Sequence, residues 1–233
     1  MAEGLIRPVG MAPPATVVIF GASGDLARRK RVPALHSVAC RGLLSGACRI
    51  VGVARTPFSD ETFRQRLFEG VETYARLKSG AHLCEMWSHF AARHTYLVGA
   101  YDDPETYRRL HQRAAAWFEE GGQPDRAAAH YLRIGEPEQA ARVMDAAAEA
   151  LLRAGRLHTL IEWAERLPEA VLRAHPRLAL SAGKAASRVG EQAQTIRWLD
   201  MASAAFRSRG ERHLLGMTLA AQALVAFNQG TYM

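Results

Sequence analysis

The stretch VVIFGASGDLARRKRVPAL, from Val17 to Leu35, decides the fold of the first part of the chain. It begins with the apolar run Val17–Phe20, which ends at a glycine and is typical of a fully buried strand. Gly21 follows directly, and a helical pattern begins at Asp25 and is expected to continue to about Leu44. A strand that turns through glycines straight into a helix predicts the opening of a βαβ unit.

Strands and helices continue to alternate after this stretch. The sequence predicts a second strand at Arg49–Ala54, a helix capped by Ser59 and running to about Arg76, a further helix near Leu83–Arg93, and a third strand at Thr95–Ala100. Alternation of this kind implies right-handed crossovers and a parallel sheet. We therefore expect a three-stranded half-Rossmann sheet with strand order 3-2-1.

The glycine loop carries the chemistry of this unit. Gly21 and Gly24 lack the Cβ atom that would keep a pyrophosphate away from the backbone, and the first turn of the following helix presents free N–H groups. The spacing is G-x-x-G-x-x-A, ending at Ala27, which differs from the usual G-x-G-x-x-G. The same residues also fit an ordinary tight turn between a strand and a helix.

The residue after the second predicted strand indicates which cofactor the loop would take. Sites for NAD usually place a carboxylate there for the ribose hydroxyl, but this chain has Arg55. A guanidinium suits a 2′-phosphate, and the hydroxyl of Ser23 can add a contact to the same phosphate. The sequence therefore favours NADP over NAD.

Composition narrows the class of protein. The chain has 233 residues and a formal net charge of +7. A basic cluster, Arg28–Arg31, lies beside the glycine loop, where it suits a small anionic ligand better than nucleic acid. The three cysteines have no CxxC spacing, and no apolar run is long enough to cross a membrane. We expect a cytoplasmic protein that binds neither membrane nor nucleic acid.

Three blocks of the first half resemble a known family. VIFGASGDLARRKRVPAL, IVGVARTPF and MWSHFAARHTYLVGAYDDPETYRRL are similar to the N-terminal NADP-binding domain of glucose-6-phosphate dehydrogenase, over about residues 16–110. The resemblance implies that Arg55 holds the 2′-phosphate and that Lys30 reaches the nicotinamide and sugar phosphate in a supporting catalytic role. It also implies a cofactor loop made of Gly21, Ala22, Ser23, Gly24, Asp25 and Leu26.

The residues after these blocks contain no match to the segment that carries the general base in that family. Oxidation of a sugar hydroxyl needs a base, held by a carboxylate, to take the proton as hydride leaves. None of the nine histidines follows an aspartate, and His36, His82, His89 and His94 are expected at the surface or the edge of the core. Because Cys84, His89 and His94 do not share a helical face, no metal site is expected. We predict a catalytically incomplete protein, whose activity, if retained, would be completed in trans.

The second half is helical in pattern, and glycines mark its turns. GQPDRAAAHYLRI and GEPEQAARVMDAA repeat the order Gly-x-Pro-acid-x-Ala, which ends one helix and begins the next. Apolar residues recur at helical spacing, and Trp117, Trp163 and Trp198 are expected in the core. Short helices stacked in this way predict a TPR-like α-solenoid.

This half resembles the helical-repeat region of MalT-like LuxR-type transcription regulators, over about residues 108–230. The residues that carry the resemblance are AAWF at Ala115–Phe118, WAERLPEAVL and HPRLAL. In that family the repeats bind inducers or partner proteins, but no GxxxxGK[ST] motif occurs here. The resemblance implies an alternative function: a protein- or inducer-binding module, with the first half as a scaffold.

The two resemblances meet within one helical stretch, so we expect a chimera of two parts. Its domains are predicted as an incomplete dinucleotide-binding domain over 1–107 and a helical-repeat domain over 108–233, truncated at its C-terminus. A nonfunctional fusion product is a third interpretation. The strand Val17–Phe20 is expected at the sheet edge, where it would be covered by the helical half or pair with a partner.

Overall fold

The structure is a computed structural model that describes residues 10, 15–46, 48–75 and 87–228. The chain divides into two compact units, Met1–Leu110 and His111–Met233. The elements of the first unit are β1 (Thr16–Phe20), η1 (Ala27–Arg31), α1 (Val32–Cys40), β2 (Arg49–Ala54), α2 (Asp60–Tyr74), β3 (Thr95–Val98) and the start of α4 (Pro104–Glu120). Those of the second are the rest of α4, α5 (Pro124–Arg133), α6 (Pro137–Arg153), α7 (Leu157–Arg166), α8 (Glu169–Ala174), α9 (Pro176–Val189), α10 (Gln192–Arg209) and α11 (Arg212–Asn228).

The three strands form a parallel sheet in the order β1-β2-β3, which confirms the predicted order. Ile19 pairs with Gly52, and Gly52 pairs with Tyr96, so these residues lie on one face. Phe20, Val53 and Leu97 share the opposite face by the same register. Among the described strands β1 is an edge strand, as expected, since it pairs only with β2.

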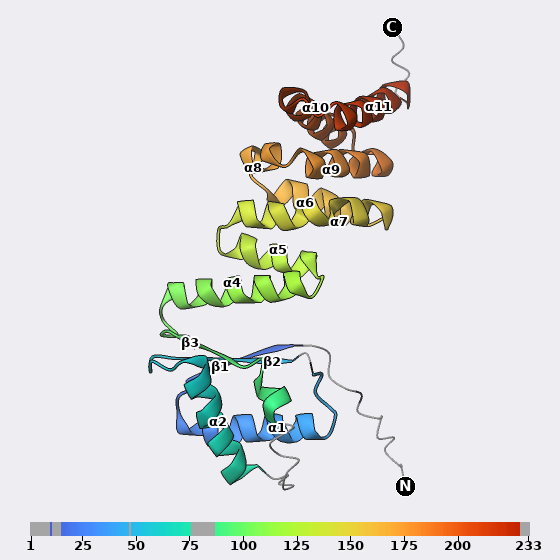
Figure 1. Cartoon of the computed structure of the whole chain (residues 1–233). Helices are drawn as coiled ribbons and strands as arrows, with labels where there is room; N and C mark the ends of the chain where they lie inside the picture. The colour runs from blue at the N-terminus through green and yellow to red at the C-terminus, as the bar shows by residue number, and fades with distance from the viewer. Residues whose placement is uncertain (1–9, 11–14, 47, 76–86, 229–233) are drawn as a thin grey trace, which may run out of the picture. The chain divides into compact units, whose positions relative to one another are not determined.

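Helices α1 and α2 lie against one face of the sheet (Figure 1). Their apolar side chains form one cluster with this face, in which Phe63 and Val71 of α2 are fully buried. On the other face, Leu110 of α4 packs against a small cluster of Val51, Val53 and Leu97. The sheet is thus positioned by apolar contacts on both sides, and its carboxyl ends carry the loops described below.

The first helix begins at Asp25, as predicted, but it differs from the prediction after its first residues and at its end. Five residues, Ala27–Arg31, form a π-helical segment, and the α-helix ends at Cys40 instead of continuing to Leu44. Gly42 adopts a positive φ of 67°, and its N–H donates to the carbonyl of Ala39. A left-handed glycine closes a helix because it costs no steric strain there. The helix therefore ends before Gly42, although apolar residues continue to Leu44 in the sequence.

The second helix starts as predicted. Ser59 is its N-cap, and the backbone N–H of Thr62 donates to the Ser59 hydroxyl at 3.0 Å. The helix ends at Tyr74, slightly before the expected Arg76, which lies outside the described residues. Of the next predicted helix, residues 87–91 are helical and residues 83–86 lie outside the described part. The third strand ends at Val98, short of Ala100.

Two histidines expected at the surface or the edge of the core are buried instead. His36 and His94 are 1% and 0% exposed, and both contact the ring of Phe90. Both are buried because residues 87–91 fold over them, and the rings of Trp87 and Phe90 contact both imidazole rings. His89 is exposed, and His82 lies outside the described residues.

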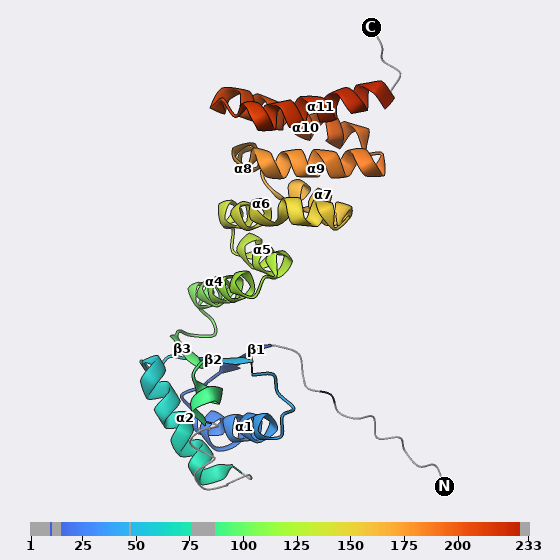
Figure 2. The ribbon, with the colours of Figure 1, turned by 45° about the vertical axis from the view of Figure 1, so that its right-hand side comes forward.

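In the second unit, glycines end the helices where the sequence predicted. Gly122, Gly135, Gly155, Gly190 and Gly210 all have positive φ, between 65° and 86°. Proline occupies the first turn of both α5 and α6, and each of these turns carries an acidic residue. Helix α5 packs on α6, α9 on α10 and α10 on α11. Figures 1 and 2 show the helices from α5 to α11 stacked in successive layers, with α8 and α9 in one layer and α10 and α11 in the next.

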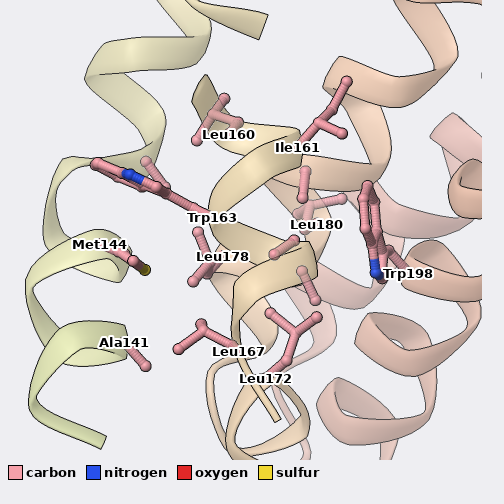
Figure 3. Packing of buried hydrophobic residues seen from close by; sticks show 14 of the residues in the cluster. Ala141, Met144, Leu160, Ile161, Trp163, Leu167, Leu172, Leu178, Leu180 and Trp198 are labelled. Atoms are coloured by element: carbon pink, nitrogen blue, oxygen red, sulfur yellow. The ribbon is translucent and has the colours of Figure 1, made fainter. Parts of the chain in front are cut away.

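The core of this unit is one continuous apolar cluster that runs through all of its helices. Figure 3 shows Trp163 beside Leu178 and Trp198 on the far side of α9. The predicted core positions of Trp117, Trp163 and Trp198 are confirmed, since the three are 9%, 4% and 2% exposed. Alanine fills many of the remaining buried positions, which allows the helices to approach closely.

Candidate cofactor site at the carboxyl ends of β1 and β2

The glycine loop is held by the neighbouring strand. The N–H groups of Gly21 and Ala22 both donate to the carbonyl of Val53, at 2.8 and 3.1 Å. The N–H of Gly24 donates back to the carbonyl of Gly21 at 3.0 Å, which closes the turn. The loop therefore lies at the carboxyl ends of β1 and β2, where ligands bind in open parallel sheets.

The two loop glycines are required for different reasons. Gly21 has φ of 70°, in the left-handed region that favours glycine. A Cβ added at Gly24 would lie 3.1 Å from the carbonyl oxygen of Gly21, which is tight. The amides that follow Gly24 open the helix, and first-turn N–H groups have no intrahelical acceptor. Together these features make a backbone surface suited to an anion.

Other residues make room for the loop to pack on the sheet. A Cβ at Gly52 would lie 2.9 Å from the Cβ of Ala22 and would also meet the ring of Phe63. Ala22 itself is buried, at 2% exposed, so its side chain supports the loop from below. Gly70 of α2 makes room for the helical segment Ala27–Arg31, because a Cβ at Gly70 would meet the carbonyl of Arg28. Sequence reasoning missed Gly52 and Gly70.

A chain of hydroxyl groups ties the loop to the end of β2. The hydroxyl of Thr56 donates to Ser23 Oγ at 3.0 Å, and the hydroxyl of Tyr96 donates to the Thr56 carbonyl at 2.8 Å. Burial raises the pKa of Tyr96, and the Ser23 hydroxyl offsets part of this rise. Thr56 and Tyr96 are site residues that the sequence analysis missed. Thr56 could have been found from its place beside Arg55.

Arg55 lies in the loop after β2, as predicted. Its side chain is exposed, and no hydrogen bond or ion pair within the described part of the chain engages its guanidinium. The Ser23–Thr56 hydrogen bond joins the glycine loop to the residue next to Arg55. The structure thus brings Ser23 and the Arg55 segment together, with the guanidinium free to take a ligand.

The remaining loop residues are placed differently. Asp25 accepts a hydrogen bond from Arg29 at 3.1 Å, and this carboxylate raises the pKa of Arg29. The guanidinium of Arg29 also lies over the ring of Tyr74, at 5.1 Å from its centroid. Leu26 is 52% exposed although it is apolar. The Asp25 carboxylate is therefore engaged by its own helix, whereas Leu26 is open to solvent.

Lys30 lies apart from the glycine loop. It lines a groove of about 670 Å³ between the first two helices, together with Pro33, Ser37, Arg41 and Tyr74. No residue of the glycine loop, and not Arg55, lines this groove. Of the eight residues predicted for the site, the structure brings the loop and Arg55 to the sheet ends and leaves Lys30 on a separate surface.

No metal centre emerges from residues 15–46, 48–75 and 87–228, since they contain no group of three or more His, Cys, Asp or Glu side chains that could hold an ion. In the same residues, no helix has both the length and the apolar character needed to cross a membrane.

Known proteins are similar to the part of the chain that carries this site. The family model for "Glucose-6-phosphate dehydrogenase, NAD binding domain" matches residues 18–162, past the point near residue 110 where the sequence blocks quoted above end. Glucose-6-phosphate 1-dehydrogenase 2 of Mycobacterium tuberculosis (strain CDC 1551 / Oshkosh) is 34% identical over 100 residues, covering 43% of this chain and 19% of the relative. Glucose-6-phosphate 1-dehydrogenase of Bacillus subtilis (strain 168) is 40% identical over 78 residues, covering 34% and 15%.

Solved structures of the same enzyme are also similar to this chain. One of glucose-6-phosphate dehydrogenase in complex with its substrate glucose-6-phosphate is 25% identical, with a TM-score of 0.44, and the match covers 55% of this chain and 28% of the other. The chain spans about a fifth of the length of the curated relatives it matches. Because the family model matches residues 18–162, more than half of the 233 residues, the chain belongs to the family of the glucose-6-phosphate dehydrogenase NAD-binding domain.

Proposed function

We propose that this protein binds NADP at the carboxyl ends of β1 and β2. The observation that carries the proposal is the free, exposed guanidinium of Arg55 next to Thr56, whose hydroxyl holds Ser23 of the glycine loop. A guanidinium and a hydroxyl at this position match the 2′-phosphate that distinguishes NADP from NAD. The Gly21–Leu26 loop supplies backbone N–H groups for the pyrophosphate.

The residues present fit such a cofactor. Gly21 leaves open space where a side chain would stand, so that phosphate oxygens can approach the backbone. The basic cluster Arg28–Arg31 lies on the helix that follows the glycine loop and adds positive potential near this loop. When bound, an oxidised nicotinamide supplies a hydride acceptor, whereas the residues described above bind and orient the nucleotide.

Isothermal titration calorimetry with the full chain tests this proposal. NADP should bind, and NAD should bind at least about tenfold more weakly because the 2′-phosphate contacts are lost. Arg55→Ala should weaken NADP binding by a similar factor and leave NAD binding unchanged. Arg207→Ala removes the same charge from an exposed position of α10 and serves as the matched control.

Equal affinity for NADP and NAD, or an Arg55→Ala protein that binds NADP as well as the parent, would contradict the assignment of Arg55. If a folded, helical sample bound neither nucleotide, the whole site would be refuted.

We propose further that the chain by itself does not oxidise glucose-6-phosphate. None of its nine histidines follows an aspartate, and Lys30 lies outside the loop region in a separate groove. Formation of reduced cofactor, followed by absorbance with glucose-6-phosphate and NADP, should stay at background. Turnover that begins only when a second protein is added would instead support completion of the site in trans.

A second candidate function rests on the helical unit, read as a TPR-like module that binds a protein partner. The observation that favours it is a groove of about 490 Å³ between α8 and α10, lined by Arg173, Arg197 and Arg209 and only one carboxylate, Glu169. Glu169 pairs with both Arg173 and Arg197, at 2.6 and 2.8 Å, so an acidic segment would replace this carboxylate on two of the three guanidinium groups. Binding of a fluorescent Glu-rich peptide, lost in Arg209→Ala, would support this function, and no binding at low salt would refute it. The β1 edge as a partner surface stays a prediction.

A further inference from the structure

The groove that contains Lys30 carries positive charge without a carboxylate. Arg29, Lys30 and Arg41 line it, and none of the described residues around it is acidic. Its volume of about 670 Å³ lies within the range of pockets that hold small molecules. Positive charge gathered along a concave surface attracts anions and raises their local concentration. Because no residue of the glycine loop lines the groove, it is a separate candidate site.

One side of the first helix lines the groove from end to end. Lys30, Ala34, Ser37 and Arg41 follow one another at intervals of three or four residues, so they share a face of this helix. Lys30 and Arg41 are separated by about three helical turns, or about 16 Å along the axis. The short side chains of Ala34 and Ser37 lie between them and leave the middle of the groove open.

The three cations differ in how they are held. Arg29 donates to the Asp25 carboxylate at 3.1 Å, and its guanidinium lies over the ring of Tyr74, 5.1 Å from the centroid. These contacts orient Arg29, and Asp25 offsets part of its charge. The side chains of Lys30 and Arg41 are exposed and have no ion pair or hydrogen bond within the described part of the chain. The groove therefore offers two free positive charges and one oriented guanidinium.

Apolar side chains line the rest of the groove. Pro33 and Val38 come from α1, Leu43 from the turn that follows it, and Tyr74 from the end of α2. Val38 and Tyr74 are each 38% exposed, although both carry large apolar surfaces. Helices α1 and α2 pack against each other (Figure 1), so the walls belong to elements that are in contact. Such a lining suits a ligand that joins an anionic part to a planar or apolar part.

We infer that this groove is a second ligand site, which takes a small polyphosphate ester that carries an aromatic group. Lysine and arginine both bind phosphate oxygens through charge-assisted hydrogen bonds. Both side chains are long, so the cationic ends of Lys30 and Arg41 can approach one chain of phosphate groups from opposite ends of the groove. The aromatic group then lies against the exposed surfaces of Val38 and Tyr74. Nucleoside triphosphates belong to this class, and ATP serves as the probe.

Calorimetric titration of the full chain with ATP, without divalent cations, tests the inference. Lys30→Gln and Arg41→Gln should each raise the dissociation constant at least about fivefold, because each removes a charge-assisted contact. The matched control is Arg31→Gln, which removes the same charge from the exposed neighbour of Lys30 that does not line the groove, and it should change the affinity by less than about twofold. Circular dichroism checks that all variants keep the helical content of the parent. A folded parent that does not bind ATP, or equal affinities for the parent, Lys30→Gln and Arg41→Gln, would overturn the site.

Two further titrations test the ligand class. Inorganic triphosphate should bind more weakly than ATP, because it leaves the apolar wall uncovered, and adenosine should bind more weakly than either, because it lacks the anionic part. Tyr74→Ser should weaken the binding of ATP and leave the binding of triphosphate unchanged. Triphosphate that binds as tightly as ATP would overturn the aromatic part of the assignment.

Competition with NADP separates this site from the proposed cofactor site. Saturating NADP should not displace ATP, and Arg55→Ala should bind ATP as the parent does. Arg41→Gln should keep the parent's response to NADP, so that failure of either site leaves the other to be judged on its own titration. Displacement of ATP by NADP would place ATP at the glycine loop and overturn the second site.

Discussion

The hydroxyl of Thr56 donates a 3.0 Å hydrogen bond to the hydroxyl of Ser23, across 33 residues of sequence. This bond joins the loop after β1 to the loop after β2, at the place that we propose for the 2′-phosphate of NADP. It fixes the direction of the Ser23 oxygen before any ligand arrives, and the Tyr96 hydroxyl holds the Thr56 backbone in turn. The proposed site is thus preorganised by contacts between consecutive strands.

Removal of this bond should weaken NADP binding. Thr56→Val keeps the shape of the side chain but cannot donate, and a hydrogen bond of about 1 kcal/mol corresponds to roughly a fivefold rise in Kd. Calorimetric titration measures the change. Thr73→Val removes a threonine hydroxyl that donates to the Glu69 carbonyl of its own helix, and it should leave the affinity unchanged. Identical affinities for the parent and Thr56→Val would show that the bond does not orient Ser23.

Gly70 is expected to tolerate no side chain. A Cβ at this position would overlap the carbonyl oxygen of Arg28 and approach its Cγ to 2.9 Å, so Gly70→Ala should destabilise the protein by about 1–3 kcal/mol. The comparison is Gly216→Ala, a helical glycine with open space around it, which should stabilise by about 0.5–1 kcal/mol through helix propensity alone. Urea unfolding at low protein concentration measures both, and equal effects would contradict the packing argument.

Stability should fall in mild acid because of His94. Burial lowers its pKa to about 4, and neither ring nitrogen has a hydrogen-bond partner among the described residues. The unfolded chain binds a proton near pH 6.5, whereas the folded protein resists it until about pH 4. The free energy of unfolding should therefore decrease between pH 6.5 and pH 4, by on the order of 3 kcal/mol.

The His94→Phe variant should show a shallower pH dependence than the parent, because phenylalanine has no proton to bind, whereas His36, whose pKa burial also lowers, still contributes. Denaturant titrations at several pH values, with the exposed His89→Gln as control, measure the slope. A slope that His94→Phe leaves as steep as before would assign the acid sensitivity to other groups.

The helical core should depend strongly on Trp198. This side chain is 2% exposed and lies in the apolar cluster beside α9, so Trp198→Ala should cost about 3–5 kcal/mol. Ile196→Ala, on the same helix but 47% exposed, should change stability by less than about 0.5 kcal/mol. Thermal unfolding compares the two, and similar losses would mean that the core is not built around α9 and α10.

The sequence by itself determined the elements whose signals are local. The apolar run before Gly21, the Ser59 cap and the glycines that close the helices of the second unit each act within a few residues, so the strands, their order and most helix ends could be predicted. The placement of Arg55 after β2 followed from the same alternation. These features depend on backbone conformation and on periodicity, which a sequence carries directly.

Tertiary structure alone decided the features that depend on contacts between distant residues. Gly52 and Gly70 matter because Ala22 and Arg28 approach them from elsewhere in the chain. His36 and His94 are buried because the residues 87–91 cover them, and Thr56 enters the site through Ser23. Lys30 lines a separate groove because its position in the first helix places it beside Pro33, Ser37 and Tyr74. Burial and proximity are set by packing between elements, and packing appears only once the chain has folded.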